Sequence, residues 1–298
     1  MKLKNRSIRA LVNLIDDPDQ SVYNQIKSEL SHLSIEDIPV LEEQLMLKSL
    51  SQSTLIDIQK IISEIQVNYE VENFSDWLNN PDKSLIEGVF RVNKVLYPEL
   101  DFEELNKEIA LIKQSVWLEI NNKQTSFEIV KTINTLLFDY NKFKIVNETK
   151  SFPFHFCLKA IIEDREGSAF GLSLLYSVIA QSLDLPIYPI IHPNNKVILA
   201  YLDKGHVLSE LNLDPMNSGV LFYIDLVEEE KIIDYYWIEK SFKEKNIPLR
   251  RAYLEPASTT EVIKSYIQSV LLAFHRKNKV NGRSFSLERL LEKIDFSD

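Results

Sequence analysis

Two neighbouring stretches decide the fold of this 298-residue chain: EGSAFGLSLLY at residues 166–176 and LDLP at residues 183–186. The first begins with a glycine turn and continues as a helix that is apolar on most sides. A helix with that composition is typical of a buried position. The proline at the end of the second stretch ends the helical segment, because proline cannot continue a helix. We therefore expect a central buried helix that passes directly into a strand.

Short β-rich runs follow this helix. They lie at residues 187–191, 196–202, 220–225 and 231–236. Turn residues separate them, at 193–195, 204–205 and 217–219. Strands joined by such short turns pair antiparallel. The sequence therefore predicts a small antiparallel sheet beside the central helix.

The rest of the chain carries apolar residues at helical spacing. In residues 1–67 the first such stripe ends at the aspartate-rich, proline-containing segment 16–19, and further stripes follow it. Helical patterns continue over residues 70–145 and return at 260–274 and 287–294. Helices, then a small antiparallel sheet, then helices again is an α+β order. We predict three units, at residues 1–67, 68–258 and 259–298.

The first predicted unit resembles a HEAT-type repeat, with a helix, an aspartate-rich turn, a second helix and then a helix entered through proline. Such a repeat buries its apolar face only against a neighbour. One convincing unit is present, so a long solenoid is not expected. A plain helical subdomain fits the same pattern equally well, and either would be a scaffold that carries no chemistry.

Together these motifs resemble the transglutaminase-like and papain-like superfamily, and in particular its bacterial SirB1-like branch. Residues 166–186 are similar to the central helix and the entry into the first strand of that branch. Residues 198–201 and 220–225 are similar to its second and third strands. The helices around Trp117 and residues 133–138 match its usual lead-in, and the HEAT-like start is similar to that of some longer members. The resemblance extends over about residues 8–275.

The resemblance also implies where catalytic residues would stand. The family uses a cysteine at the start of the central helix, a histidine on the next strand and an aspartate on the one after. In this sequence those positions are occupied by Ala169, Lys196 and Asp225. A methyl group cannot act as a nucleophile, and an ordinary lysine is protonated at neutral pH and is a poor base. The branch usually has polar residues where this chain has Ala169 and Gly171, so the resemblance implies that the inherited activity is lost.

A displaced set of residues offers an alternative. Ser168 is next to the nucleophile position and His192 lies four residues before Lys196. A Ser168–His192–Asp225 arrangement needs a one-residue shift of the helix and a bent strand, so we expect His192 to be a loop residue instead. Cys157 is expected to be a small buried apolar residue. The other two histidines considered, His155 and His206, are expected to be solvated or singly hydrogen-bonded.

Composition and charge exclude several classes of function. The net charge is −10, which disfavours binding to nucleic acid. The basic cluster at residues 275–283 is too short to reverse this and is interpreted as a solvated helix end. No apolar run approaches the roughly 20 residues that span a bilayer, and the first residues do not form a secretory signal. With one cysteine the chain has no intrachain disulfide, which favours a reducing, cytoplasmic location.

Signatures of cofactor and metal sites are also missing. The chain has six glycines and no Gly-rich phosphate loop. The carboxylate clusters at residues 16–19 and 228–230 lack the spacing of a calcium loop. We therefore expect no cofactor and no metal.

Three hypotheses follow from the sequence. The first is a non-catalytic binding or scaffold protein whose ligand, a protein or peptide, lies between the helix at 171–181 and the sheet. The second is an active hydrolase or acyltransferase that uses Ser168, His192 and Asp225. The third is a protein–protein adaptor that works through the N-terminal helices. None of them fixes the oligomeric state.

Overall fold

The N-terminal helices form a separate small core. The computed structural model describes residues 2–15, 19–47, 50–205, 207–211, 214, 216, 218–227, 231–277 and 282–296. The N-terminal helices are α1 (Lys2–Leu14), α2 (Gln20–Ser31), α3 (Ile38–Met46) and α4 (Gln52–Leu78), with a short 3₁₀ turn at Ile35–Asp37. Their apolar stripes meet in one cluster that extends from Ile8 to Ile65. Segments 16–18 and 228–230 and His206, which the sequence interpretation used, lie outside the described residues.

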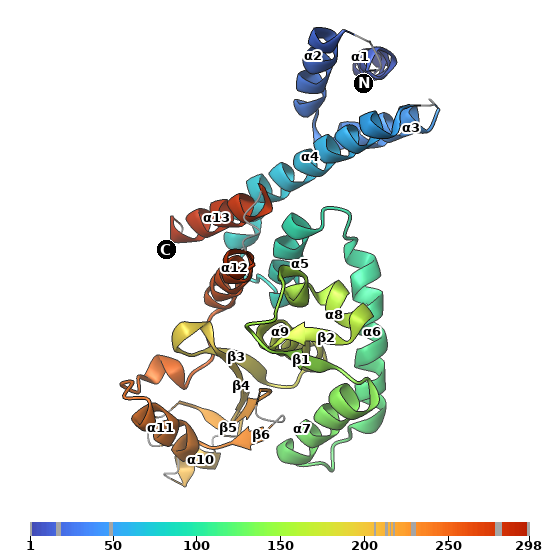
Figure 1. Ribbon diagram of the computed structural model, residues 1–298. Helices are drawn as coiled ribbons and strands as arrows, with labels where there is room; N and C mark the ends of the chain where they lie inside the picture. The colour runs from blue at the N-terminus through green and yellow to red at the C-terminus, as the bar shows by residue number, and fades with distance from the viewer. Residues whose placement is uncertain are drawn as a thin grey trace.

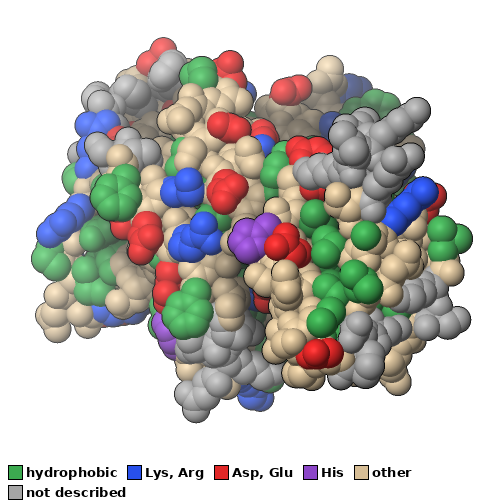
Figure 2. Space-filling model, turned by 90° about the horizontal axis from the view of Figure 1, so that it is seen from above, with side chains coloured by type: hydrophobic (Ala, Val, Ile, Leu, Met, Phe, Trp, Pro, Cys, Tyr) green, Lys and Arg blue, Asp and Glu red, His purple; other side chains and the backbone are tan. Residues whose placement is uncertain are grey.

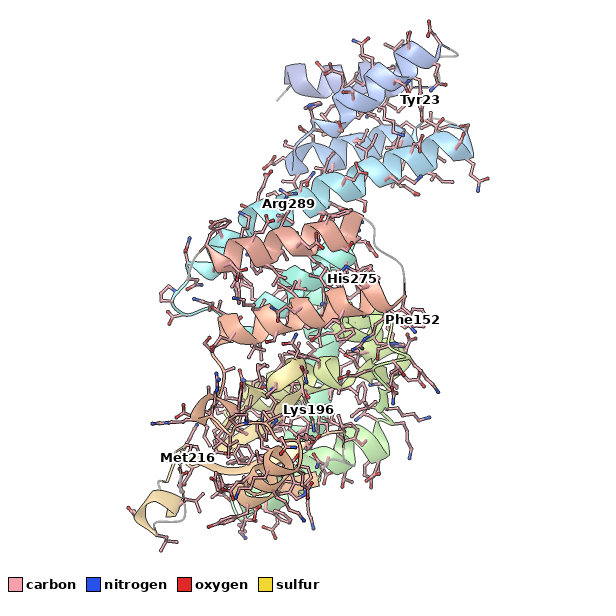
Figure 3. The ribbon with its side chains drawn as sticks, turned by 60° about the vertical axis from the view of Figure 1, so that its left-hand side comes forward. Tyr23, Phe152, Lys196, Met216, His275 and Arg289 are labelled. Atoms are coloured by element: carbon pink, nitrogen blue, oxygen red, sulfur yellow. The ribbon has the colours of Figure 1, made fainter. Side chains whose placement is uncertain are left out.

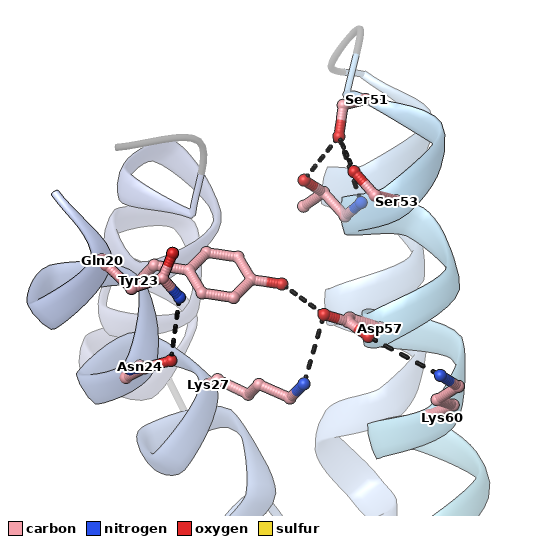
Figure 4. Close-up of polar contacts among 9 residues, drawn as sticks. Gln20, Tyr23, Asn24, Lys27, Ser51, Ser53, Asp57 and Lys60 are labelled. Atoms are coloured by element: carbon pink, nitrogen blue, oxygen red, sulfur yellow. Dashed lines mark hydrogen bonds and ion pairs between the residues drawn. The ribbon is translucent and has the colours of Figure 1, made fainter. Parts of the chain in front are cut away.

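Polar contacts hold α2 against α4. The Tyr23 hydroxyl donates to Asp57 Oδ2 at 2.6 Å, and Lys27 Nζ lies 3.2 Å from the same oxygen. Lys60 approaches the other carboxylate oxygen of Asp57 at 3.9 Å. Figure 4 shows the tyrosine and both lysines converging on this one carboxylate. The carboxylate thus fixes how the second helix lies on the fourth.

The long helix α4 joins this core to the main one. Its buried residues up to Ile65 belong to the N-terminal cluster, and those from Val67 onward belong to the large cluster. The change of core falls between Ile65 and Val67, and the helix continues through it. Its sequence has no proline or glycine before the break at residues 79–81. Figure 1 shows α4 running from the N-terminal helices to the rest of the molecule.

Helices surround the central helix of the main unit. They are α5 (Leu85–Leu96), α6 (Phe102–Glu119), α7 (Ser126–Asn134) with a π-helical extension Thr135–Tyr140, α8 (Leu158–Asp164) and α9 (Ala169–Ser182). α9 is the predicted central helix, and its residues from Phe170 to Ala180 are all buried. Trp117, in a predicted apolar stripe of α6, is instead 62% exposed.

The sheet has the predicted antiparallel order. Its strands β3 (Ile187–Ile191), β4 (Val197–Leu202), β5 (Val220–Asp225) and β6 (Lys231–Ile233) lie side by side in chain order. A 3₁₀ turn at Pro193–Asn195 joins β3 to β4, and the short helix α10 (Val207–Glu210) precedes β5. The predicted fourth run ends early, because Asp234 accepts a hydrogen bond from Trp237 N at 2.9 Å and starts helix α11 (Tyr235–Glu244).

A second, two-stranded sheet was not predicted. β1 (Lys144–Val146) pairs in parallel with β2 (Glu166–Ser168), which leads directly into α9. The sequence predicts a turn at the start of α9. It does not predict that residues 166–168 pair with residues 144–146, which lie 22 residues earlier. Both strands have only three residues, so neither shows a usable alternation of polar and apolar side chains.

The last helices belong to the main core. A 3₁₀ turn at Arg251–Tyr253 precedes α12 (Thr259–Arg276), and α13 (Gly282–Asp295) follows it. Tyr266 of α12 accepts a hydrogen bond from Asn93 at 2.5 Å and donates to the carbonyl of Phe156 at 2.7 Å. α12 and α13 thus pack into the cluster that holds α9. The chain is an α+β protein, as the sequence predicts.

Candidate functional site

The start of α9 is shaped by a capping serine and a glycine. Ser168 Oγ accepts a hydrogen bond from Gly171 N at 3.0 Å, so it is the N-cap of the helix. A Cβ atom on Gly171 would lie 2.5 Å from Ile161 Cδ1 and 3.0 Å from the carbonyl oxygen of His155. Glycine is therefore needed for the close approach of α9 to the segment before it. Ala169, the first helical residue, is half-buried.

The entry to β4 is a tight turn. Asn194 and Asn195 both have left-handed backbone, with φ values of 62° and 56°. Asparagine is one of the few non-glycine residues that adopt this conformation readily. His192 N donates to the carbonyl of Lys196 at 2.7 Å and closes the turn. The turn places Lys196 directly before β4, at the end of that strand.

Lys196 and Asp225 form an ion pair. Lys196 Nζ donates to Asp225 Oδ2 at 2.6 Å, while Asp225 Oδ1 accepts from Val227 N at 3.0 Å. Because Leu199 faces Ile224 across the ladder, Ile198 is opposite Asp225, and Lys196 lies two residues along the same face. Asp225 is fully buried, whereas the side chain of Lys196 is 34% exposed. The two residues at the family's histidine and aspartate positions are thus joined to each other.

A cleft of about 430 Å³ brings these features together. It is lined by residues 145–149, by 168–170 at the start of α9, by 194–197, by Phe156 and Val227, and by Ser269, Leu272 and Arg276 of α12. Lys196 lies below α12 in Figure 3, between the last helices and the sheet. Ala169 and Lys196 therefore face one cavity, and Asp225 lies behind Lys196.

The displaced set Ser168–His192–Asp225 is not assembled. Ser168 caps α9, and Asp225 binds Lys196. His192 is 8% exposed and its Nε2 donates to the carbonyl oxygen of Tyr253 at 2.9 Å. Burial lowers the pKa of His192 to about 4, with the hydrogen bond to Tyr253 acting in the opposite direction. His192 lies in the loop directly before the turn at Pro193–Asn195, and its ring is buried.

The other candidate residues are structural. Cys157 is buried, as expected, and burial raises the pKa of its thiol to about 11. His155 is also buried, and its Nδ1 accepts a single hydrogen bond from Phe152 N at 2.9 Å. Burial lowers the pKa of His155. His206 lies outside the described residues.

Two residues of the basic cluster hold the segment 148–152, and one of them, Arg276, lines the cleft, a role that the sequence interpretation missed. Arg276 Nη1 donates to the carbonyl of Glu148 at 3.1 Å, and its Nη2 lies 3.5 Å from the Glu148 carboxylate. Lys277 Nζ donates to the carbonyl of Thr149 at 3.2 Å and lies 4.3 Å from the centre of the Phe152 ring. Figure 3 shows Phe152 close to the end of α12 that carries His275. No local signal reveals this role, because the partners are 128 residues apart.

Comparison with known proteins agrees with the fold. A family model for the transglutaminase-like superfamily matches residues 103–268, more than half of the chain. The matched segment contains α9, all strands of both sheets, and the positions Ala169, Lys196 and Asp225. The chain therefore belongs to the transglutaminase-like superfamily. Neither the curated proteins nor the solved structures gave a match.

Within the described residues, no helix is long and apolar enough to cross a membrane. No group of three or more His, Cys, Asp or Glu side chains among them is arranged to hold a metal ion.

Proposed function

We propose that this chain is a non-catalytic member of its superfamily whose former active-site cleft binds a protein or peptide. The observation that carries the proposal is the Lys196–Asp225 ion pair beside Ala169. The pair occupies the place of the base and its orienting carboxylate, and the lysine nitrogen donates a hydrogen bond to the carboxylate where a histidine would accept a proton. The half-buried methyl group of Ala169 takes the place of the nucleophile.

The finer family assignment is part of the same proposal. Membership of the SirB1-like branch is supported by the order of the central helix, its Leu-x-Leu-Pro exit and the strands that follow. A HEAT-like origin of the N-terminal helices is supported by their separate core. A cytoplasmic location is supported by the single cysteine, which is a buried free thiol.

Turnover measurements test the absence of catalysis. The purified full chain, incubated with an amine donor and a glutamine-containing peptide, is expected to give no product above buffer. The same result is expected for hydrolysis of peptide substrates. Turnover that is lost in Ser168→Asp, which keeps a capping oxygen but removes the hydroxyl, would overturn the proposal in favour of a serine-based hydrolase.

The N-terminal helices support a second candidate function, that of an adaptor. At the end of α3, Met46 is 87% exposed and Leu47 is 75% exposed, beside a core that is independent of the cleft. Acidic and basic side chains are interspersed over the described part of the face seen from above in Figure 2, which suits a protein partner better than nucleic acid. Replacing Met46 and Leu47 by glutamate should remove a co-purifying partner without unfolding the chain. A partner that stays bound contradicts the adaptor role.

A further inference from the structure

One face of α6 is exposed and apolar. Leu111, Trp117 and Leu118 are 69%, 62% and 66% exposed. Leu111 and Leu118 are two turns apart on the same side of the helix, and Trp117 lies beside Leu118. The other exposed residues between 110 and 118, Ala110 and Gln114, carry no charge. In Figure 1, α6 forms the right-hand edge of the molecule, so this face is open to a partner.

A groove of about 680 Å³ lies beside this face. Residues 115, 118 and 119 of α6 line one side of it, and residues between 131 and 141 line the other. The side chains of Ser115, Thr132 and Asn141 each donate to a backbone carbonyl three to five residues earlier, at 2.7, 3.0 and 2.7 Å. These polar groups are therefore already bonded, and the groove suits an apolar side chain better than a small polar ligand.

The groove has two charged residues, and they are of opposite sign. Glu119 and Lys131 both line it, and both are exposed. Lys131 Nζ lies 4.9 Å from the centre of the Phe127 ring. Neither Glu119 nor Lys131 forms an ion pair within the part of the chain that the structure describes. Both charges are thus available to another molecule.

A second copy of this chain fits the face and the groove together. A two-fold dimer uses one surface twice, so that surface must carry both halves of every contact. Here the exposed ring of Trp117 lies next to a groove, and an acidic residue shares that groove with a basic one. With a net charge of −10, two copies repel each other, so they approach best where the exposed side chains are uncharged or of both signs.

The size of the apolar surface indicates a reversible dimer. Tyr140, which lines the groove, is 75% exposed. Together with Leu111, Trp117 and Leu118 it presents on the order of 500 Å² of side chain. That is at the upper end of the patches that monomeric proteins leave exposed. Covering it on both copies buries about 1,000 Å², near the lower limit of a specific interface, so we expect association in the micromolar range.

We propose that the chain forms a two-fold symmetric dimer through this face of α6 and the adjoining groove. Trp117 of each copy lies in the groove of the other, and Glu119 of each copy faces Lys131 of the other. The groove and the cleft at the start of α9 share no lining residue. The dimer therefore does not depend on what the cleft does.

Sedimentation equilibrium of the full chain from about 1 to 200 μM tests the proposal. The mean mass should rise from one chain to two. Trp117→Ala should weaken the dimer about thirtyfold, as expected for an aromatic anchor at the centre of an interface. Tyr236→Ala is the matched control and should dimerise as the wild type does, because Tyr236 is 63% exposed on α11, across the molecule from α6 in Figure 1. A chain that stays monomeric at 200 μM overturns the proposal, as does a dimer that Trp117→Ala leaves unchanged.

Charge exchange tests how the two copies face each other. Glu119→Lys places two lysines together at each contact and Lys131→Glu places two carboxylates together, so each should weaken the dimer about tenfold. Both residues are exposed, so the variants should melt as the wild type does in circular dichroism. The double variant restores opposite charges and should dimerise nearly as the wild type does. A double variant no stronger than either single one contradicts the two-fold arrangement, and so does growth beyond two chains, which an open head-to-tail contact would give.

Discussion

At the start of β4, a lysine neutralises a carboxylate that the protein has fully buried. The Lys196–Asp225 contact is 2.6 Å long, and within the described residues the other hydrogen bond of the carboxylate comes from Val227 N. If the cation is removed, the buried carboxylate still carries the free-energy cost of leaving water, and the attraction that offset this cost is gone. The ion pair therefore stabilises the fold at the start of β4.

Removing the lysine should therefore destabilise the protein. We expect Lys196→Met to lower the free energy of unfolding by about 1–3 kcal/mol, measured by urea denaturation. Adding Asp225→Asn should recover part of the loss, because the unpaired charge is then gone. Lys240→Met is the control, since its partner Glu244 is 3.9 Å away on an exposed helix face, and about 0.5 kcal/mol or less is expected. Equal effects of the two lysine substitutions would contradict the proposed role of the pair.

A cysteine placed at the nucleophile position should be reactive. In Ala169→Cys the thiol would stand at the first position of a 14-residue helix, where the helix dipole lowers a thiol pKa. Alkylation by iodoacetamide at neutral pH should be at least about tenfold faster than that of Cys157, whose pKa is raised to about 11. Ala180→Cys on the same helix is the buried control. If Ala169→Cys reacts as slowly as Ala180→Cys, the helix start is not open to the cleft.

The buried histidine predicts a pH dependence of stability. Burial lowers the pKa of His192 from 6.5 to about 4, so the unfolded chain binds a proton in this range that the folded chain does not. The neutral ring therefore makes its full contribution to the free energy of unfolding above pH 6.5. This contribution is lost as the pH falls toward 4, by about 3 kcal/mol in all. Lys196, Asp225 and Lys245 are the charged groups that act on the ring.

Denaturation of His192→Gln at several pH values checks this. Glutamine keeps a donor for the Tyr253 carbonyl but does not titrate, so the free energy of unfolding should fall less steeply between pH 6.5 and 4 than in the wild type. Identical slopes for the two proteins would show that His192 is not the responsible group.

The order of the elements along the sequence is what selects the candidate site residues. Ala169, Lys196 and Asp225 were aligned by their places before a helix and beside two strands, and the structure joins the latter two directly. The partner of His192 could not be predicted, because the Tyr253 carbonyl is 61 residues away and any residue type has a carbonyl. The capping role of Ser168 can be predicted locally, because serine is favoured directly before the first residue of a helix.

At the scale of elements, the contact between α9 and the Pro153–Phe156 turn depends on one glycine. We expect Gly171→Ala to lower the free energy of unfolding by about 1–3 kcal/mol, because the added methyl group meets Ile161 and the His155 carbonyl. Gly282→Ala is the matched control, since a Cβ there meets no heavy atom within 4 Å. A Gly171→Ala protein as stable as Gly282→Ala would show that α9 can move away at little cost.

The elements that the sequence predicted are those with long local patterns. The apolar run of α9 and the runs of β3, β4 and β5 are each at least five residues long and are bounded by turn residues. β1 and β2 were missed because each has three residues and their pairing is non-local.

At the scale of the whole molecule, α4 couples two hydrophobic cores. α13 lies along this helix, with Arg289 donating to Asn68 at 3.0 Å and Lys293 donating to Ser75 at 3.1 Å. Arg283 contacts Ser63 on the N-terminal side of the change of core. The last helix therefore spans the point where the two cores meet, and it contacts α4 on both sides of that point.

A break in α4 between the cores should uncouple them. Gln66→Pro removes a backbone donor and places the proline ring against the carbonyl four residues earlier, which costs about 3 kcal/mol in a helix interior. We expect amide exchange in α2 and α3 to quicken while exchange in α9 stays as in the wild type, because α9 belongs to the other core. Gln52→Pro is the control, since proline is accepted at the first position of a helix. If α9 is equally affected, the two cores unfold as one cooperative unit and α4 transmits the loss from one to the other.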